Sequence, residues 1–330
     1  MKMKQTLIIG AGHAGQNLHL KTLKKLEINT LVGFVDNNII KSIPDINRKN
    51  IFKNLSSVDG FPADSTVVHI CTPPQSHKKI IEELLQMGYM NIIIEKPMSN
   101  NYKDAIDINT LIIDSNSQGT IFVVANWLYS KVIWHLRDKL SDTKLAVSTV
   151  KMQQSKPRFE KTTSNTYKES IFDIEMPHLV VLAMYLFGKD LKYNISKCGD
   201  MVYESITYKN MGWATLEMVS REGFIINLET SLVSKKRSRK LEITLEDKSK
   251  MMCTFPSGGD DNFISEFQSW TPNGELIDSI TFQDETLSTF ISMAYGAFNE
   301  EGAALISNGE LNLEVCKMLE KAKSNSIHCP

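Results

Sequence analysis

The first fifteen residues constrain this chain more than any other segment. An apolar run, Thr6–Ile9, leads directly into the hexapeptide GAGHAG, which carries glycine at residues 10, 12 and 15. Glycine at the first position permits a tight turn, at the second lets phosphates approach the backbone, and at the third lets a helix pack closely on the strand. The amides at that helix's N-terminus then face the anion. The segment predicts a site for the pyrophosphate of a dinucleotide, contacted by Gly10, Gly12 and Gly15.

A carboxylate follows at the spacing that such a site requires. A second hydrophobic run, Thr30–Val35, ends at Asp36, which lies 21 positions after Gly15. An acidic residue at about this distance binds the ribose hydroxyls of a dinucleotide. Asp36 would repel a 2′-phosphate, and Asn37 and Asn38 follow it instead of Arg or Lys. We therefore expect NAD(H) in preference to NADP(H).

Composition excludes several classes of protein. The 330 residues favour two domains, and 37 Lys and Arg against 38 Asp and Glu give no reason to expect nucleic acid or an anionic membrane as a partner. The five cysteines form no CxxC pair and no metal-ligand spacing, so we expect reduced thiols and a cytoplasmic protein without a metal site. The longest apolar stretch, Leu179–Phe187, is too short to span a bilayer, and no signal peptide is expected.

Residues 1–126 alternate strand and helix patterns, which predicts an α/β domain with a parallel, doubly wound sheet, the Rossmann arrangement. We expect strands at Gln5–Ile9, Thr30–Asp36, Thr66–Cys71, Asn91–Ile94 and Ile121–Ala125, and helices at Ala14–Leu26, Gln75–Met87 and Tyr102–Asn116. The stretch between Asn37 and Asp64 has no clear pattern.

Residues 127–330 predict a second α/β domain with an open, mainly antiparallel sheet. Its expected elements are a strand at Lys144–Gln154, a loop at Ser155–Lys168, one apolar helix at Ile171–Phe187, and closing helices at Thr286–Ser307 and Leu311–Asn325. Further strands are expected at Lys192–Lys197, Met201–Tyr208, Trp213–Ser220, Phe224–Val233, Lys240–Leu245 and Lys250–Phe255, with turns at Asn210–Gly212 and Arg221–Gly223. The basic run Lys235–Lys240 is interpreted as a hairpin tip, with a contact to a substrate phosphate as the alternative.

Two segments of the first domain place polar residues after buried strands, where ligands of an open α/β sheet bind. Cys71–Pro74 has a rigid turn that would present Thr72 to a nucleotide, and Glu95–Pro97 follows the strand Ile92–Ile94. A lysine beside a nicotinamide ring donates or accepts the proton of a substrate hydroxyl, so Lys96 is the candidate acid–base group. The alternative is a surface ion pair between Glu95 and Lys96.

The GAGHAG loop, His19, Asp36, the Thr72-Pro73-Pro74 turn with His77, and Glu95-Lys96-Pro97 together resemble the Gfo/Idh/MocA oxidoreductases, which include glucose-fructose oxidoreductase and inositol dehydrogenase. The resemblance extends in organisation over the whole chain. It implies a Rossmann domain followed by an α/β domain, with Lys96 as the catalytic lysine. It also implies that the cofactor is contacted by Gly10, Gly12, His13, Ala14, Gly15, Asp36, Thr72, Pro73, His77, Glu95 and Asn126.

The second domain departs from the family's motif. Members commonly carry Asp, three residues, then His, whereas here His178 follows Asp173 by five positions. The resemblance still implies a catalytic His178, with either Asp173 or Glu175 orienting it. Arg158 and Tyr167 lie in the loop before this segment and are candidate substrate contacts.

The expected activity is hydride transfer between NAD and a secondary alcohol or ketone of a sugar, sugar derivative or cyclitol, the substrate class being implied by the resemblance. Two alternatives stay open. One is another enzyme class on the same scaffold, an NAD-using glycosidase or an imine-type reductase. The other is a non-catalytic nucleotide-sensing regulator, which the altered His178 segment suggests. We expect a small-molecule substrate and a homodimer or homotetramer.

Overall fold

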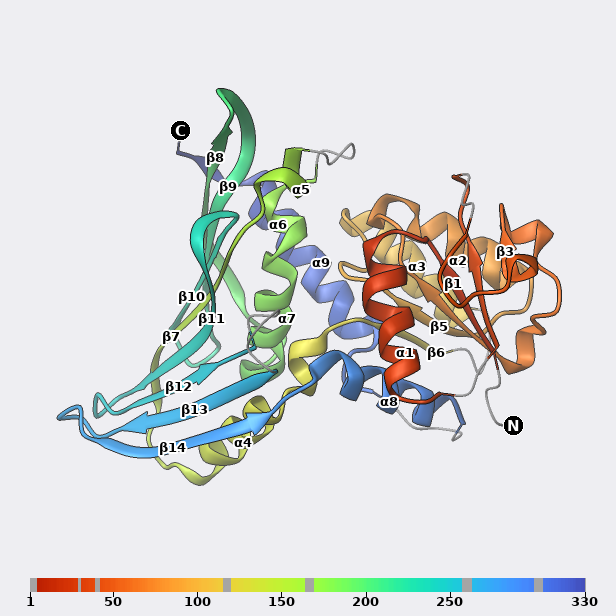
Figure 1. Cartoon of the computed structure of the whole chain (residues 1–330). Coiled ribbons are helices and arrows are strands. Elements are labelled where there is room, and N and C mark those ends of the chain that lie inside the picture. Colours follow the sequence, from red (N-terminus) through yellow and green to blue (C-terminus); the bar gives the residue numbers. More distant parts are fainter. Residues whose placement is uncertain are drawn as a thin grey trace. The chain divides into compact units, whose positions relative to one another are not determined.

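The computed structural model describes residues 5–28, 31–38, 42–114, 120–163, 169–256, 263–299 and 305–329. The chain divides into two compact units (Figure 1). Unit 1 contains residues 1–125 and 287–316, and unit 2 contains residues 126–286 and 317–330. Unit 1 is built on a sheet of six strands and unit 2 on a sheet of nine.

The sheet of unit 1 is parallel throughout, with strand order β3-β2-β1-β4-β5-β6. Its strands are β1 (Gln5–Ile9), β2 (Leu31–Val35), β3 (Ile51–Phe52), β4 (Thr66–Ile70), β5 (Asn91–Ile94) and β6 (Thr120–Val123). Its helices are η1 (Ala14–Leu20, a π-helix), α1 (Lys21–Lys25), α2 (His77–Gln86), α3 (Tyr102–Asp114) and α8 (Thr286–Asn299), with single 3₁₀ turns at η2 (Arg48–Asn50), η3 (Leu55–Ser57), η4 (Ala63–Ser65) and η5 (Pro74–Ser76). The predicted Rossmann arrangement is confirmed.

The central strands of this sheet read as nearly continuous apolar runs because both of their faces are buried. Leu7 in β1, Val68 in β4 and Ile92 in β5 have no exposed surface. Parallel strands all end at the same edge, so the segments that follow β1, β2, β4 and β5 meet at the carboxyl edge of the sheet. This edge holds the glycine loop, Asp36, the Cys71 turn and Glu95.

Unit 2 holds a mixed sheet in which antiparallel pairs predominate, with strand order β14-β13-β12-β11-β7-β10-β9-β8-β15. Only the pairs β10–β7 and β15–β8 are parallel among the described strands. The strands are β7 (Val147–Pro157), β8 (Lys192–Tyr203), β9 (Ile206–Val219), β10 (Ile225–Ser231), β11 (Val233–Leu245), β12 (Lys250–Thr254), β13 (Ile264–Trp270), β14 (Leu276–Gln283) and β15 (Ile327–His328). The helices are η6 (Asn126–Tyr129, a 3₁₀ turn), α4 (Lys131–Asp142), α5 (Phe159–Thr163), α6 (Ile171–Ile174), α7 (Met176–Phe187) and α9 (Gly309–Ser324), which begins in unit 1.

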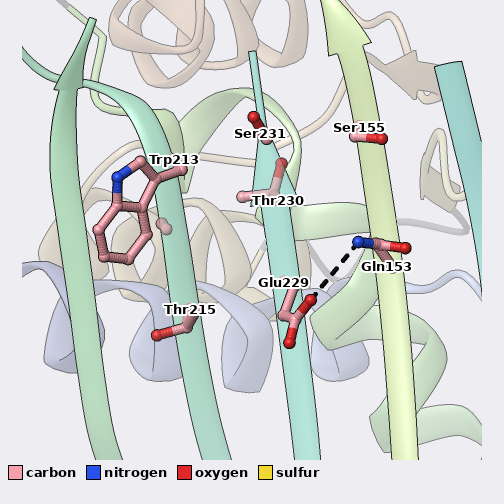
Figure 2. A pocket seen from close by; sticks show the side chains of 8 residues that line it. Gln153, Ser155, Trp213, Thr215, Glu229, Thr230 and Ser231 are labelled. Atoms are coloured by element: carbon pink, nitrogen blue, oxygen red, sulfur yellow. Dashed lines mark hydrogen bonds between the residues drawn. The ribbon is translucent and has the colours of Figure 1, made fainter. Parts of the chain in front are cut away.

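The two faces of the nine-stranded sheet differ in chemistry. Helix α7 contacts β7 and β10, and α4 contacts β12, β13 and β14. Met152, Leu216 and Leu228, which alternate toward this helical layer, are fully or almost fully buried. The opposite face carries half-buried polar side chains such as Gln153, Thr215 and Glu229, and Figure 2 shows it with the helices behind the strands.

The predicted single helix Ile171–Phe187 is wrong in one respect, because the structure divides it into α6 and α7. The break falls at Glu175, whose φ of −115° departs from the roughly −63° of a regular α-helix. Pro177 explains why the chain restarts there. Proline lacks an N–H group and is tolerated in the first turn of a helix but not in its interior.

Two predictions about the strands of unit 2 are also wrong. The expected strand Met201–Tyr208 spans the turn between β8 and β9, where Glu204 and Ser205 have positive φ angles of 48° and 64°. The expected turn at Asn210–Gly212 lies inside β9. Glycine is required there because a Cβ at residue 212 would lie 2.1 Å from the carbonyl oxygen of Asp200 on β8.

The basic run Lys235–Lys240 is not a hairpin tip, which corrects the sequence interpretation. It lies within β11, whose pairing with β7 is interrupted after Val233 and resumes where Ser238 pairs with Ser155. Lysine and arginine residues occupy the resulting bulge and the strand beyond it. A strand can continue through such a bulge because the extra residues are accommodated on one strand only.

Several elements had no counterpart in the prediction. Helix α4, strands β13 and β14, and the short β3 were not anticipated, and the expected loop after residue 155 contains the end of β7 and α5. The turn at Arg221–Gly223 is confirmed. Across the described residues, no helix is both long and apolar enough to cross a membrane.

Candidate functional site

The glycine loop after β1 satisfies two separate steric conditions. Gly10 has a φ of +97°, and a Cβ there would lie 3.0 Å from the carbonyl carbon and oxygen of Cys71. A Cβ at Gly15 would lie 2.1 Å from the carbonyl oxygen of Gly10, whereas a Cβ at Gly12 would meet no atom within 4 Å. Glycine is therefore required at residues 10 and 15 because neighbouring backbone atoms leave no room for a side chain. At Gly12 the open space fits the approach of a ligand phosphate.

Asp36 anchors this loop from the end of β2. Its Oδ2 accepts a hydrogen bond from the backbone N–H of Ala11 at 2.8 Å. Its Oδ1 accepts from the backbone N–H of Asn38 at 2.9 Å and from Asn38 Nδ2 at 3.0 Å. The carboxylate is half-buried, and a carboxylate oxygen has capacity for further donors such as ribose hydroxyls. His13 is exposed and Ala14 half-buried at the start of η1.

The turn after β4 is held by His77, which has no exposed surface. The ring of His77 contacts the carbonyl oxygens of Thr72 (Nε2, 2.8 Å) and Met98 (Nδ1, 3.1 Å), and burial lowers its pKa. Ser76 Oγ is 2.8 Å from Thr72 Oγ1. His77 therefore holds the backbone of this turn, while Thr72 and Pro73 are half-buried at its surface.

Glu95, at the end of β5, is paired with a buried histidine. Its Oε1 lies 3.0 Å from His19 Nε2, and its Oε2 accepts the backbone N–H of Lys96 at 3.2 Å. Burial lowers the pKa of His19, but Cys71 and Glu95 raise it by more, to about 10. Burial raises the pKa of Glu95, but His19 and Lys96 outweigh it and the pKa is lowered. At neutral pH His19 is an imidazolium and Glu95 a carboxylate. The ionic partner of Glu95 is therefore the buried His19, whereas the alternative interpretation of the sequence paired Glu95 with Lys96 alone at the surface.

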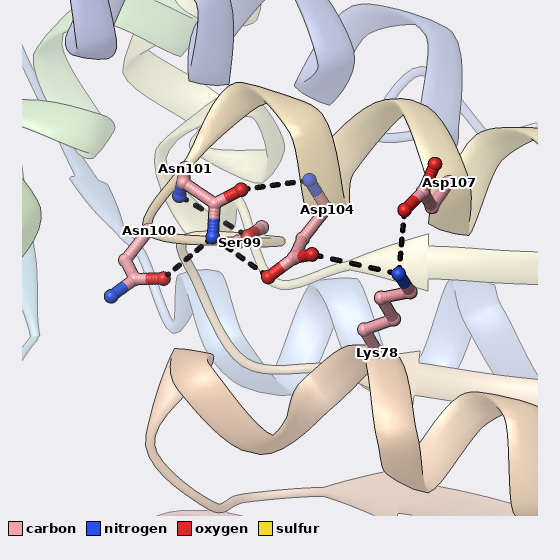
Figure 3. A network of polar contacts seen from close by, with 6 residues as sticks. All are labelled: Lys78, Ser99, Asn100, Asn101, Asp104 and Asp107. Atoms are coloured by element: carbon pink, nitrogen blue, oxygen red, sulfur yellow. Dashed lines mark hydrogen bonds and ion pairs between the residues drawn. The ribbon is translucent and has the colours of Figure 1, made fainter.

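The segment that follows Lys96 is fixed by a polar network at the start of α3 (Figure 3). Asn101 Oδ1 accepts the backbone N–H of Asp104 at 2.8 Å, and Asn101 Nδ2 donates to Asp104 Oδ2 at 2.7 Å, which caps the helix. Lys78 of α2 joins Asp107 of α3 at 2.5 Å. These contacts fix the start of α3, which follows residues 96–98. Lys96 therefore lies in a short segment between the buried strand β5 and the capped helix α3.

In unit 2, His178 lies in the first turn of α7 and is half-buried. Its ring stacks on Trp127 with centroids 5.7 Å apart and planes 14° apart. Trp127 stacks in turn on Phe255 at 4.5 Å and 18°. The stack fixes the plane of the imidazole. Trp127 is 3% exposed, as a core residue is.

The two carboxylates considered as partners of His178 have different neighbours. Asp173 caps α6 by accepting the backbone N–H of Ser170, and its Oδ1 pairs with Lys323 Nζ at 2.8 Å. Glu175, which is 2% exposed, pairs with Lys156 and also accepts a hydrogen bond from Gln154. The assignment of Asp173 as a catalytic residue stays a prediction, and the contacts give it a structural role in addition.

Three further predicted residues belong to this part of the chain. Arg158 is half-buried at the end of β7, and its Nη1 is buried without a hydrogen-bond partner among the described residues. Within the same described ranges, Asn126 Oδ1 is also buried and unpartnered. Buried polar atoms are almost always hydrogen-bonded, so each of these atoms is a candidate ligand contact. Tyr167 lies outside the described residues.

A hollow on the polar face of the nine-stranded sheet involves none of these residues (Figure 2). It is lined by Gln153, Ser155, Trp213, Ala214, Thr215, Glu229, Thr230 and Ser231. Its volume of about 150 Å³ is well below the roughly 300 Å³ at which pockets for small molecules begin. This hollow is therefore too small to be a candidate site for a small-molecule substrate. Among the described residues, no cluster of His, Cys, Asp and Glu is arranged to hold a metal ion.

Residues 4–122 match the family described as "Oxidoreductase family, NAD-binding Rossmann fold", GFO_IDH_MocA. No curated protein matches the chain significantly.

Solved structures share the fold over almost the entire chain. UDP-N-acetylglucosamine 3-dehydrogenase GnnA from Acidithiobacillus ferrooxidans is 18% identical with a TM-score of 0.76, covering 99% of this chain and 98% of that one. KijD10, a 3-ketoreductase from Actinomadura kijaniata solved with NADP and TDP-benzene, is 12% identical with a TM-score of 0.76, covering 99% of each chain. The region that matches the family model includes both the glycine loop and the Glu95–Lys96 segment. Residues 4–122 therefore carry the NAD-binding Rossmann domain of the Gfo/Idh/MocA oxidoreductase family.

Proposed function

We propose that this enzyme transfers a hydride between NAD and a secondary alcohol or ketone of a sugar, sugar derivative or cyclitol. The observation that carries the proposal is the carboxyl edge of unit 1. There the open space at Gly12, the Asp36 carboxylate and the Glu95–Lys96 segment follow three strands of one parallel sheet.

The preference for NAD(H) is supported by Asp36. Both of its oxygens already accept backbone N–H groups, so the carboxylate is held in place and cannot swing away from a 2′-phosphate without losing these bonds. Asn37 and Asn38, which follow it, offer no positive charge. A bound nicotinamide would supply or accept the hydride.

The chain's own residues supply the proton chemistry and the positioning. The Lys96 ammonium would donate a proton to the oxygen of a ketone, or its amine would accept one from an alcohol. Glu95 is held by His19 beside this lysine and keeps negative charge there. In unit 2, His178 has its ring plane set by the stack on Trp127 and would hold or exchange a second substrate proton.

The substrate class includes sugars linked to nucleotides. One structural neighbour is named for UDP-N-acetylglucosamine and another was solved with TDP-benzene. The buried, unpartnered Nη1 of Arg158 is a donor suited to a substrate carboxylate or phosphate.

The first experiment is a titration of the purified chain, freed of co-purified nucleotide, with NADH and separately with NADPH, followed by nicotinamide fluorescence. We expect micromolar NADH affinity and much weaker NADPH affinity. A screen of sugar alcohols, ketones and nucleotide sugars follows, with Lys96→Ala as the control that binds NADH but turns over no substrate. Absence of binding by both nucleotides would refute the proposal. Net formation of NADH during turnover separates a dehydrogenase from an NAD-using glycosidase.

A further inference from the structure

A continuous line of hydrogen bonds runs through the interior of unit 1 from Glu95 to Thr6. His19 Nε2 is 3.0 Å from Glu95 Oε1, and His19 Nδ1 is 2.8 Å from His69 Nδ1. His69 Nε2 is 3.0 Å from Tyr295 Oη, which is 2.6 Å from Thr6 Oγ1. The line joins helix η1, strands β1 and β4, the residue that follows β5, and helix α8.

The interior members of this line are buried. His19, His69 and Thr6 have no exposed surface, and Tyr295 is 5% exposed. Buried polar groups are costly unless they are fully hydrogen-bonded. Because every ring nitrogen of this buried line has a hydrogen-bond partner, we look for a role of these residues other than filling the core.

The partners of the two rings allow two arrangements of the protons. Glu95 is an acceptor when ionised, so His19 Nε2 carries a hydrogen. The two facing Nδ1 atoms share one hydrogen, and it belongs to His19 when that ring is charged. His69 is then the Nε2–H tautomer, which donates to Tyr295, and Tyr295 donates to Thr6. If His19 became neutral at Nδ1, His69 would have to change tautomer and the Tyr295 hydroxyl would have to turn around.

The charged groups around His19 favour the arrangement in which the His19 ring is protonated. The groups facing His19 are Glu95, Cys71 and His69, with Lys96 beside Glu95. The pKa of His19 is raised to about 10, whereas burial and the positive charge of His19 lower that of His69 well below its ordinary value. Burial raises the pKa of the Cys71 thiol, which His19 opposes. At neutral pH one ring of the pair is therefore charged and the other neutral.

We infer that His69 and Tyr295 are positioning residues of the oxidoreductase site: they hold His19 as a donor at both ring nitrogens and thereby fix the Glu95 carboxylate beside Lys96. The contribution of this line to hydride transfer rests on the proposed function, whereas the protonation state of His19 does not. The inference assigns a role to α8, which returns to unit 1 about 200 residues after β5.

The test is histidine ring NMR on the ¹⁵N-labelled full chain without cofactor, between pH 6 and 11. In the wild type we expect His19 to give an imidazolium spectrum and His69 to give the neutral Nε2–H tautomer. Tyr295→Phe removes the acceptor for His69 Nε2–H, so His69 moves its hydrogen to Nδ1 and His19 loses one. The expected result is an apparent His19 pKa at least one unit lower, or about tenfold in the protonation equilibrium.

A matched control separates this effect from the loss of a buried hydroxyl. Tyr89 is also buried in unit 1, and its hydroxyl donates to the carbonyl oxygen of Phe61 at 2.8 Å, away from the line. Tyr89→Phe should leave the spectra of His19 and His69 unchanged. His69→Phe is a second variant, in which His19 loses the acceptor at Nδ1 and should have a lower pKa than in the wild type. Unchanged His19 spectra in Tyr295→Phe would overturn the inference, as would a neutral His19 in the wild type at pH 7.

The consequence for the site is read from NADH binding by nicotinamide fluorescence at pH 7.5. We expect Tyr295→Phe to weaken binding or shift the emission of bound NADH, and Tyr89→Phe to match the wild type. If the wild type shows the NMR signature but binds no NADH, the proposed function fails and the protonation assignment stands. If Tyr295→Phe changes the NMR signature but not NADH binding or emission, the positioning role is refuted while the proposed function stands.

Discussion

Gly15 leaves room for no more than a hydrogen atom beside the carbonyl oxygen of Gly10, because a Cβ at residue 15 would lie 2.1 Å from that oxygen. We predict that Gly15→Ala lowers the free energy of unfolding by about 1–3 kcal/mol or more, as overpacking against rigid backbone does. Gly12→Ala is the matched control, since its Cβ meets nothing within 4 Å. Gly12→Ala should unfold like the wild type in urea yet bind NADH at least roughly tenfold more weakly. Equal NADH affinity in Gly12→Ala and the wild type would contradict the assignment of this loop to the pyrophosphate.

Asp36 has two roles that substitution separates. Asp36→Ala loses the bond to Ala11 and the proposed bonds to ribose, so we expect weaker NADH binding by about 1.5–3 kcal/mol, the range for hydrogen bonds to a charged group, and a lower melting temperature. Asp36→Asn retains one oxygen for Ala11 and should preserve the melting temperature while improving NADPH binding relative to NADH. The measurement is fluorescence titration with both nucleotides beside thermal unfolding. A wild type that prefers NADPH would contradict the cofactor preference.

Asp173 and Lys323 form a largely buried ion pair at 2.8 Å, with side chains 7% and 22% exposed. Removing one partner leaves a buried charge, so Asp173→Asn and Lys323→Met should each lower the free energy of unfolding by on the order of 1–3 kcal/mol. Urea unfolding of both single variants and the double variant measures the coupling. If Asp173 acts only in structure, NADH-dependent turnover per folded molecule should equal that of the wild type. A large loss of kcat in Asp173→Asn but not in Lys323→Met would instead support the catalytic assignment.

Stability should depend on pH through His19. Its folded pKa of about 10 exceeds its ordinary value of 6.5, so the folded state binds the proton more tightly than the unfolded state. The contribution of His19 to stability is therefore complete below about pH 6.5 and is lost as the pH rises through about 10. We predict that the difference in unfolding free energy between the wild type and His19→Gln shrinks steadily over this range. A difference independent of pH between 6.5 and 10 would contradict the charged state of His19.

The N-terminal unit is predictable because its signals are local. Each central strand is an apolar run, and each following segment carries its own turn residues, so Gln5–Ile9 and Asn91–Ile94 are strands in the structure at the predicted bounds. Asp36 was placed by spacing alone, and the carboxyl edge of a parallel sheet then brings it to the glycine loop. What spacing did not reveal is that Asp36 already bonds to Ala11.

The second unit was harder because its strands have long-range partners. The basic residues 235–237 read as a solvated tip, but they lie in a bulge between paired segments of one strand. Gly212 read as a turn, but its small size serves the approach of a neighbouring strand. The amphipathic residues of α4 did carry a local signal, since Val132, Ile133 and Leu136 recur at helical spacing and are buried. That helix could have been predicted.

The sequence by itself determined the class of the protein. Turn geometry, strand periodicity and the placement of charged residues after buried strands are encoded by neighbouring residues, and these sufficed for the Rossmann domain, the candidate lysine and the family. Tertiary structure decided which groups act together. His19, His69 and Tyr295 are separated by up to 276 positions, and only the packing of η1 and α8 around the parallel sheet brings their ring atoms within hydrogen-bond distance. Their protonation states follow from burial and from one another, which no local pattern in the sequence records.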